Sequence, residues 1–470
     1  MKPPRHPFNP DNPLAVETLQ NQGVVGRVLT RHVGLKPDLR SNGLFWFKSG
    51  GLRLIALALT LAVAPALAEP PASLPGANLE SLLELARSQN PEFATMRYEA
   101  EAAAERVYPA GALPDPTLRT ELRDITNQGT EASPNLLPGR IGSTKYTLIQ
   151  PVPFWGKRDL KQDVAEAQAN QARGSASANW EELAARIKTA YAQYYVLVHT
   201  EALTREILGL VGSLEQITQA RYASGLAPQQ DVIRVQVERT SMRGELVAIG
   251  NERHHAQVKL NTLLKRPAMA SLADPERLRP IPSPAKLDHG ALEERLRSRN
   301  PQLFVEEARV TAAAKNRELV YRNRYPDFNL GLSPIQTGGR INEWELMIEL
   351  NIPLQQESRR SQEREAQAML AAAESRREST QNQLLADLAE NIAALDTARY
   401  SENLTRTSFL PQAELSFKAA LAGYETGKLD FATLLDAQRQ IRKAKLDALK
   451  AQGEMQIRLA EIERLLGEDL

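Results

Sequence analysis

The feature that most constrains the fold is a duplication, because four short motifs recur in the same order in both halves of the chain. Repeats of this kind decide the fold class before any single element does. The sequence predicts one structural repeat at residues 77–270 and a second at 287–470, joined by a proline-rich linker at 271–286 that cannot continue a helix. The matched pairs are Asn90-Pro91 and Asn300-Pro301, Tyr108-Pro109 and Tyr325-Pro326, Pro151-Val152-Pro153 and Asn351-Ile352-Pro353, and Tyr222-Ala223-Ser224-Gly225 and Tyr424-Glu425-Thr426-Gly427.

Each half contains a long run of helix-forming residues with the spacing of a coiled coil. Residues 160–222 are rich in Ala, Gln, Glu and Arg. About 60 helical residues would run about 90 Å, which is several times the thickness of a small domain. We expect kinks or joints at Gly174 and Pro411. The apolar residues of the first run recur at alternating intervals of four and three, at Ala176, Trp180, Leu183, Ile187, Ala190, Tyr194 and Leu197, and a fainter seam follows at Leu385, Leu388, Ile392 and Leu395.

A glycine follows each long helix, and another helical pattern begins just beyond it. The two segments contain Tyr222 with Gly225, and Tyr424 with Gly427. Glycine at such a place supplies the left-handed residue that ends a helix. The sequence therefore predicts tight tips of helical hairpins at 222–227 and 424–429.

Alternating apolar and polar residues predict two strands in each half. The hairpins are expected at 117–152 and 326–353, with loops at about 125–141 and 334–342. Strands with one apolar face and a Trp near one end are typical of outer-membrane barrels. Four strands cannot enclose a channel, so an oligomer must complete the barrel. The residues expected to face lipid are Phe328, Leu330, Trp344, Leu346, Ile348 and Leu350.

Residues 1–68 have the pattern of a leader that ends in a signal peptide. An apolar run at 54–64 follows Lys48 and Arg53, and it ends in Ala66-Leu67-Ala68, a small-residue cleavage site. A membrane anchor is the alternative, but the run is shorter than the ~20 residues that a spanning helix needs. We therefore expect export, with a long leader or a misplaced start codon upstream of the signal.

Composition excludes several functions. The chain has no cysteine, so a disulfide framework or a thiolate metal site is ruled out. With 58 basic and 57 acidic residues, net charge offers no case for nucleic-acid binding. No phosphate loop or G-x-S-x-G motif is present, so we expect neither an enzyme nor a cofactor. The histidines of the mature chain form no H-x-x-x-H pair, which predicts no metal site; they are His199, His254, His255 and His289.

The order of short helix, strand hairpin, long helix, Tyr-x-x-Gly tip and returning helix resembles the TolC-like outer-membrane efflux proteins, over residues 77–468. The resemblance implies a mainly helical protein with a membrane β-barrel part. It implies a homotrimer with four strands per subunit in one barrel, a periplasmic cylinder of helices and an outer-membrane location. It also implies partners in a periplasmic adaptor and an RND-type inner-membrane pump, and we expect the adaptor to dock at the tips that contain Tyr222, Gly225, Tyr424 and Gly427.

Two segments, Leu113-Pro114-Asp115-Pro116 and residues 150–158, are most similar to the heavy-metal branch of that family, which serves cobalt-zinc-cadmium or copper-silver resistance pumps. Related branches export drugs, solvents or, by type I secretion, polypeptides. An exported coiled-coil structural protein is the alternative from another class, but it predicts neither strand hairpins nor repeated tips.

The resemblance also implies a gate of polar side chains just past the tips. By position, Asp231 and Asp436 match the family's acidic gate residues, and Arg234 and Arg439 lie on the same turns. Gln236 and Gln438 lie nearby, whereas Thr433 stands where some members carry a further acid. The alternative for each charge is a solvated helix surface.

Overall fold

The computed structural model describes residues 74–125, 136–138 and 140–470. The predicted signal peptide lies outside them. No helix in these ranges is long and apolar enough to cross a bilayer. The first half contains α1 (Leu79–Gln89), α2 (Pro91–Glu105), α3 (Val107–Gly111), β1 (Thr117–Arg123), β2 (Ser143–Val152), α4 (Lys157–Ala223) and α5 (Gln229–Leu263).

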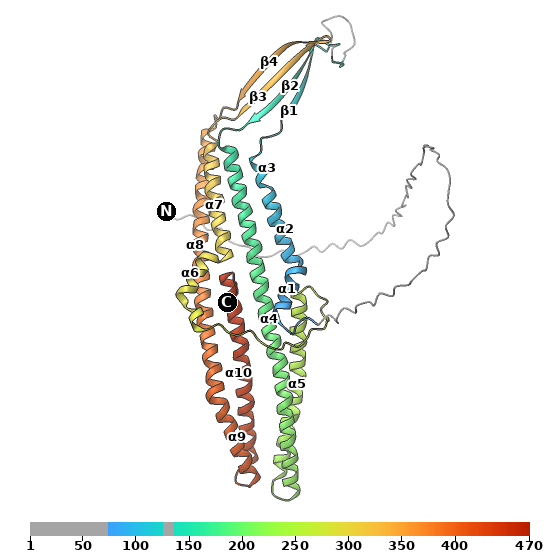
Figure 1. Cartoon of the computed structure of the whole chain (residues 1–470), viewed down its shortest axis with the longest axis vertical. Helices are drawn as coiled ribbons and strands as arrows, with labels where there is room; N and C mark the ends of the chain where they lie inside the picture. The colour runs from blue at the N-terminus through green and yellow to red at the C-terminus, as the bar shows by residue number, and fades with distance from the viewer. Residues whose placement is uncertain (1–73, 126–135, 139) are drawn as a thin grey trace, which may run out of the picture. The chain divides into compact units, whose positions relative to one another are not determined.

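The second half repeats this order (Figure 1), with its returning helix again running beside the long one. Its elements are η1 (Pro284–Leu287), α6 (His289–Arg299), α7 (Pro301–Arg322), β3 (Phe328–Thr337), β4 (Arg340–Leu350), α8 (Gln356–Leu404), η2 (Thr405–Phe409), α9 (Leu410–Glu425) and α10 (Phe431–Leu466).

The two predicted helix interruptions have different outcomes. The joint near Pro411 is confirmed, because a π-helical turn at Thr405–Phe409 separates α8 from α9. The prediction at Gly174 is wrong, since α4 is one continuous helix of 67 residues that includes Gly174. A Cβ at Gly174 would lie 2.8 Å from Cδ1 of Phe304, so the glycine lets α7 pack closely on α4 instead.

The repeated Asn-Pro motif joins helices end to end. The Asn300 side chain accepts a hydrogen bond from the Leu303 N–H at 2.8 Å and donates one to the Leu465 carbonyl at 2.8 Å. Asn90 likewise donates to the Leu263 carbonyl at 2.9 Å while capping α2. Each Asn thus satisfies groups left free at one helix start and one helix end, so α10 meets α7 and α5 meets α2.

The four strands form one antiparallel sheet in the order β1-β2-β3-β4, so both hairpins contribute to it. The loop between β3 and β4 is only Gly338-Gly339, which makes the predicted loop at 334–342 too long. A register shift between Ile335 and Gln336 breaks the alternation of apolar and polar residues there. The ends of β3 and β4 could therefore not be predicted from the alternation.

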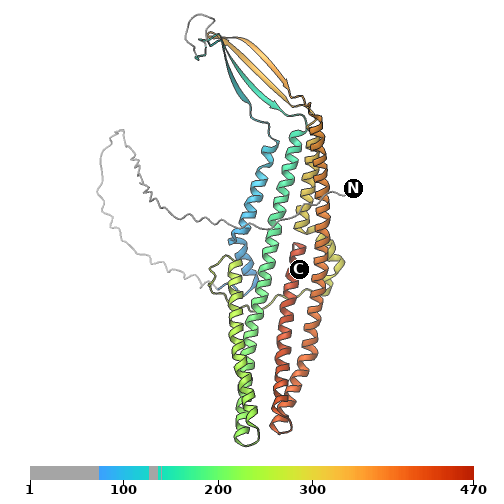
Figure 2. The same ribbon diagram turned by 180° about the vertical axis from the view of Figure 1, so that it is seen from behind.

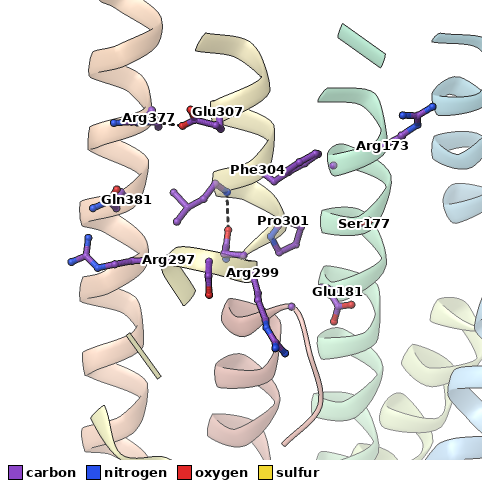
Figure 3. A pocket seen from close by; sticks show the side chains of 15 residues that line it. Arg173, Ser177, Glu181, Arg297, Arg299, Pro301, Phe304, Glu307, Arg377 and Gln381 are labelled. Carbon is purple, nitrogen blue, oxygen red and sulfur yellow. Dashed lines mark hydrogen bonds and ion pairs between the residues drawn. The ribbon is translucent and has the colours of Figure 1, made fainter. Parts of the chain in front are cut away.

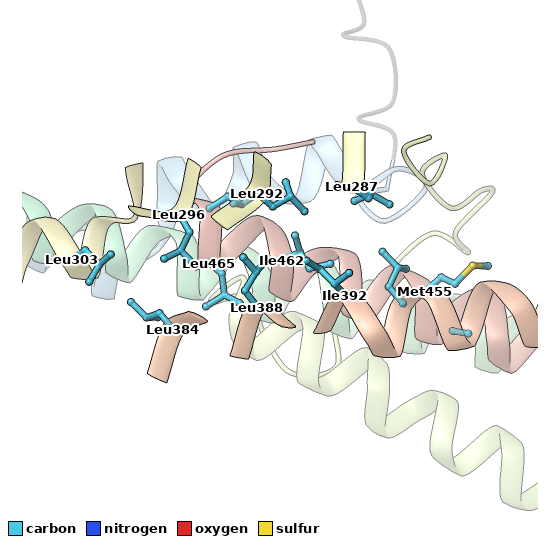
Figure 4. Packing of buried hydrophobic residues seen from close by; sticks show 13 residues of the cluster. Leu287, Leu292, Leu296, Leu303, Leu384, Leu388, Ile392, Met455, Ile462 and Leu465 are labelled. Carbon is cyan, nitrogen blue, oxygen red and sulfur yellow. The ribbon is translucent and has the colours of Figure 1, made fainter. Parts of the chain in front are cut away.

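The apolar core consists of three clusters along the helices. One joins α6, α8 and α10 through Leu292, Leu388 and Ile462, among others (Figure 4). Another packs α1 and α5 on α4. The third lies near the tips and contains residues of both hairpins, so the two hairpins pack side by side, as Figures 1 and 2 show.

Candidate functional site

The two hairpin tips have the same turn geometry. Gly225 and Gly427 both have φ of 72°, the left-handed conformation that the sequence predicts. The Leu226 N–H donates to the Arg221 carbonyl at 2.8 Å, and the Lys428 N–H donates to the Gly423 carbonyl at 2.8 Å. This is the Schellman pattern, in which the chain reverses while the last helix carbonyls stay bonded.

The two tip tyrosines differ in their surroundings. Tyr222 is 47% exposed, whereas Tyr424 is 3% exposed and packs edge-on against Phe431 at 5.5 Å. Only the first of them is therefore available to a partner without rearrangement.

The gate candidates lie just past the tips, but they are not equivalent. Asp436 is 74% exposed at its side chain, and its nearest cation is Arg439 at 3.9 Å. Asp231 is buried. Burial raises the pKa of the Asp231 carboxyl; Arg234 opposes this rise and Asp430 adds to it. Asp231 therefore accepts a proton more readily than an exposed aspartate does, and of the two acidic gate candidates only Asp436 is exposed.

The two glutamines near the gate candidates differ in their exposure. Gln438 is 1% exposed and lies inside the subunit, and Gln236 donates to Glu215 at 3.4 Å. The Gln438 side chain faces into the packed hairpins, so it is not exposed beside Asp436.

A row of ion pairs between the hairpins was not predicted. Three basic residues at intervals of three on α10 reach acids of the first hairpin, and this regular spacing is a signal that the sequence carries. The pairs are Arg439 with Glu238 at 2.5 Å, Arg442 with Glu245 at 2.9 Å, and Lys445 with Glu206 at 3.0 Å. Arg439, one of the gate candidates, thus lies closer to Glu238 than to Asp436.

One face of the sheet carries an exposed apolar surface. Leu118, Leu148, Leu332 and Leu346 are paired directly across the four strands, and all four side chains are exposed. The predicted lipid-facing residues Leu330, Trp344, Leu346, Ile348 and Leu350 are exposed on this face, and Phe328 is half-buried.

The opposite face of the sheet is largely polar. Thr147 and Ser333 are joined by a hydrogen bond of 2.9 Å between their hydroxyls. Lys145 pairs with Glu345. Gly331 leaves room for Met347, because a Cβ there would lie 2.8 Å from the methionine Cε.

The junction between strands and helices is tied by Asp327, which sequence reasoning did not single out. Its carboxylate accepts hydrogen bonds at 2.8 Å from Lys157 Nζ and from the Phe154 N–H. Burial alone would raise the pKa of Asp327, but these two hydrogen bonds outweigh it and hold the pKa below its usual range. The Phe154 and Tyr325 rings stack at 4.5 Å beside them.

A cavity of about 700 Å³ lies where α10 ends and α7 begins (Figure 3). Arginines line it, but they pair with separate acids: Arg377 with Glu307 at 2.8 Å, and Arg299 with Glu468. Their guanidinium groups do not converge on one point. In residues 74–125, 136–138 and 140–470, no three His, Asp or Glu side chains form a group that could hold a metal ion.

Comparison with known proteins identifies the family. The family model described as outer membrane efflux protein matches residues 82–265 and 292–468. The cobalt-zinc-cadmium resistance protein CzcC of Cupriavidus metallidurans is 24% identical over 408 residues, which are 83% of this chain and 90% of the relative. The pyoverdine export outer membrane protein OpmQ of Pseudomonas aeruginosa is 24% identical over 410 residues, 83% of each chain.

The fold is similar to that of solved channels of the same kind. A structure of CusC superposes with a TM-score of 0.71 at 16% identity, over 83% of this chain and 92% of that one. The long helices with a few strands confirm the predicted fold class, and the family match covers both halves of the chain. The chain is therefore an outer-membrane protein with a TolC-like channel fold, and it belongs to the outer membrane efflux protein family.

Proposed function

We propose that this chain is the channel subunit of a tripartite heavy-metal efflux pump, a homotrimer that passively conducts cations received from an adaptor and an inner-membrane pump. The observation that carries the channel role is the row of four exposed leucines across the sheet. Exposure of this apolar surface to water would be unfavourable, whereas the acyl chains of a bilayer would cover it.

The open edges of the sheet support a trimer. β1 and β4 each have one strand neighbour within the subunit, so their outer backbone groups need partners. In a bilayer those groups must be bonded within protein. Three subunits of four strands would close one barrel in which every strand edge is paired. A barrel of about eight strands is filled by its own side chains, so the larger barrel of a trimer would leave an open lumen.

The tips support docking of an adaptor. They are the exposed ends of both hairpins, and their rigid turns present Tyr222 and Leu226 to solvent. The heavy-metal cargo rests on the likeness to CzcC and on the two segments that resemble the heavy-metal branch. The equal identity to OpmQ makes export of an organic compound the second candidate.

Deletion of the gene tests the cargo. We expect the deletion strain to lose growth on Co²⁺, Zn²⁺ or Cd²⁺, or on Cu⁺, while it tolerates a panel of drugs and solvents as the parent does. Plasmid-borne wild type should restore growth. Sensitivity to drugs alone would show that the cargo is organic, and unchanged sensitivity to every compound would contradict an efflux role.

Asp436 provides a test of the gate. In a three-fold assembly, three copies of this carboxylate would face one another unless cations of neighbouring subunits pair with them. Exposed pairs of this kind contribute about 0 to 1 kcal/mol each, so an adaptor could displace them. We expect Asp436→Ala to raise single-channel conductance in planar bilayers and to admit vancomycin into cells, with trimer stability little changed.

Asp447→Ala is the matched control for this gate. It removes an acid from the same face of α10 about three turns further from the tip, so it should change neither conductance nor leakage. If Asp436→Ala matches wild type at both low and high salt, Asp436 is a solvated surface charge and the gate lies elsewhere.

A further inference from the structure

One side chain of the first hairpin bridges both tips. Arg221, in the last turn of α4, donates from Nη1 to the Glu425 carbonyl at 2.7 Å. Its Nη2 donates to the Leu226 carbonyl of its own tip at 3.4 Å. The guanidinium also lies over the Tyr424 ring, 4.9 Å from the ring centre. A single planar group with several donors therefore contacts both turns.

The second tip is shaped to receive this arginine. Tyr424 is buried beneath it and is held from the other side by Phe431. A Cβ at Gly427 would lie 3.5 Å from Nη2 of Arg221, whereas nothing lies within 4 Å of the corresponding position at Gly225. The close approach is thus confined to the tip that accepts the bridge.

The bridge runs in one direction only, because the repeats differ at this position. The residue before the tip tyrosine is Arg221 in the first repeat and Gly423 in the second. Gly423 is itself crowded, since a Cβ there would lie 2.6 Å from Cδ1 of Leu429. The second repeat therefore supplies the socket and the first supplies the arginine.

Each of the two joined turns exposes one leucine side chain. Leu226 in the first tip and Leu429 in the second are both exposed at the end of the molecule. An exposed apolar patch at a defined place marks a contact surface more often than scattered single residues do. Two turns joined by the bridge present a larger surface than either turn alone, and they lose less conformational freedom on binding.

We propose that Arg221 is a positioning residue that joins the two tips of a subunit into one docking unit, and that the adaptor recognises the pair through Leu226 and Leu429. This inference rests on the proposed docking of an adaptor at the tips. It adds that the spacing between the hairpins, and not only the shape of each turn, determines recognition.

The experiment compares three variants of the full-length channel in detergent. Arg221→Gln removes the guanidinium, and Arg221→Lys keeps the charge over the tyrosine but loses the planar set of donors. Arg239→Gln is the control, because Arg239 pairs with Glu215 at 2.7 Å within the first hairpin and makes no bridge between tips. Hydrogen exchange of residues 423–430 measures the order of the second tip. The binding measurement uses the purified periplasmic adaptor of the same efflux system.

We expect Arg221→Gln to speed exchange at 423–430 and to weaken adaptor binding about tenfold, the size of effect that a partly exposed cation–π contact together with its hydrogen bonds supplies. Arg221→Lys should restore both measurements in part, and Arg239→Gln should change neither. A purely local role of Arg221 in its own turn would leave exchange at 423–430 unchanged.

The outcomes separate this inference from the proposed function. Unchanged exchange in Arg221→Gln would overturn the bridge. Faster exchange with unchanged affinity would show that the adaptor reads each tip separately, which contradicts recognition of the pair. If the wild-type channel does not bind the adaptor, the proposed docking fails, and the exchange measurement still decides whether Arg221 joins the tips.

Discussion

Replacing Glu463 by alanine is expected to lower the free energy of unfolding by about 3 to 5 kcal/mol. The Glu463 side chain is fully buried on α10 and accepts hydrogen bonds from Lys188 Nζ at 2.7 Å and from Arg279 at 3.0 and 2.9 Å. It also accepts the Leu470 N–H at 3.2 Å. Without the carboxylate, the buried Lys188 would keep only Asp469, and Arg279 would lose its partner.

The size of this effect follows from desolvation. A buried charge that loses its partner is not resolvated by water, so the cost exceeds the net value of the pair itself. The network also joins α4, α10 and the linker, which holds the two repeats together at one level. Denaturant titration of the helical signal in detergent measures the change.

Glu454→Ala is the control on the same helix. Glu454 pairs with Arg458 at 2.7 Å, one turn away on the surface, and such pairs contribute about 0.3 to 0.5 kcal/mol. Glu463→Gln should fall between the two, because it keeps an acceptor while losing the charge. A loss in Glu463→Ala no larger than that in Glu454→Ala would show that the network does not stabilise the fold.

Glu463 also shows where sequence reasoning ends. Its partners lie 184 and 275 residues away along the chain, and a glutamate on a helix rich in charge reads as a surface residue. Nothing local indicates that three charges from α4, α10 and the linker share one buried site. Contacts of this kind depend on tertiary packing, which local sequence patterns do not predict.

Features set by local geometry could be predicted. The turns at Gly225 and Gly427 require a left-handed residue, and only glycine adopts this conformation without strain. The four strands followed from period-two alternation, which failed only at the register shift beside Ile335. The gate stays a prediction, because it requires the proposed trimer, in which other subunits would surround Asp436.

The second large effect is expected on the exposed apolar face of the sheet, which we propose lies against lipid. Ile348→Arg should cost about 2 to 4 kcal/mol of folding free energy in a bilayer, because it places a charge in the apolar band. Ile348 is exposed and pairs across the sheet with Leu330, which is also exposed. Glu349→Arg, on the opposite face, should be tolerated, since that face already carries Lys145 with Glu345.

The aromatic residues at the two ends of the sheet support our proposal that Ile348 lies within the apolar band of the membrane. Trp344 lies toward the Gly338-Gly339 turn, whereas Phe328 pairs with Leu350 and contacts the exposed Trp155 at the helical end of the sheet. Trp344 and Leu350 are six residues apart, roughly 20 Å along an extended strand. Aromatic girdles mark the two edges of the apolar band in outer-membrane barrels. If Trp344 and Phe328 mark these edges, Ile348 lies between them, which is why we expect a charge there to be costly.

To measure this difference, each variant is refolded into lipid vesicles, and the yield of heat-modifiable trimers is read from gels. Ile348→Arg should give few trimers and Glu349→Arg a yield near that of wild type, while both should keep the helical signal in detergent, where no bilayer penalises the new charge. Equal loss of trimers in the two variants would mean that the faces of β4 do not differ in their surroundings. The exposed leucine row would then face something other than lipid, and the channel would have to close around a different surface.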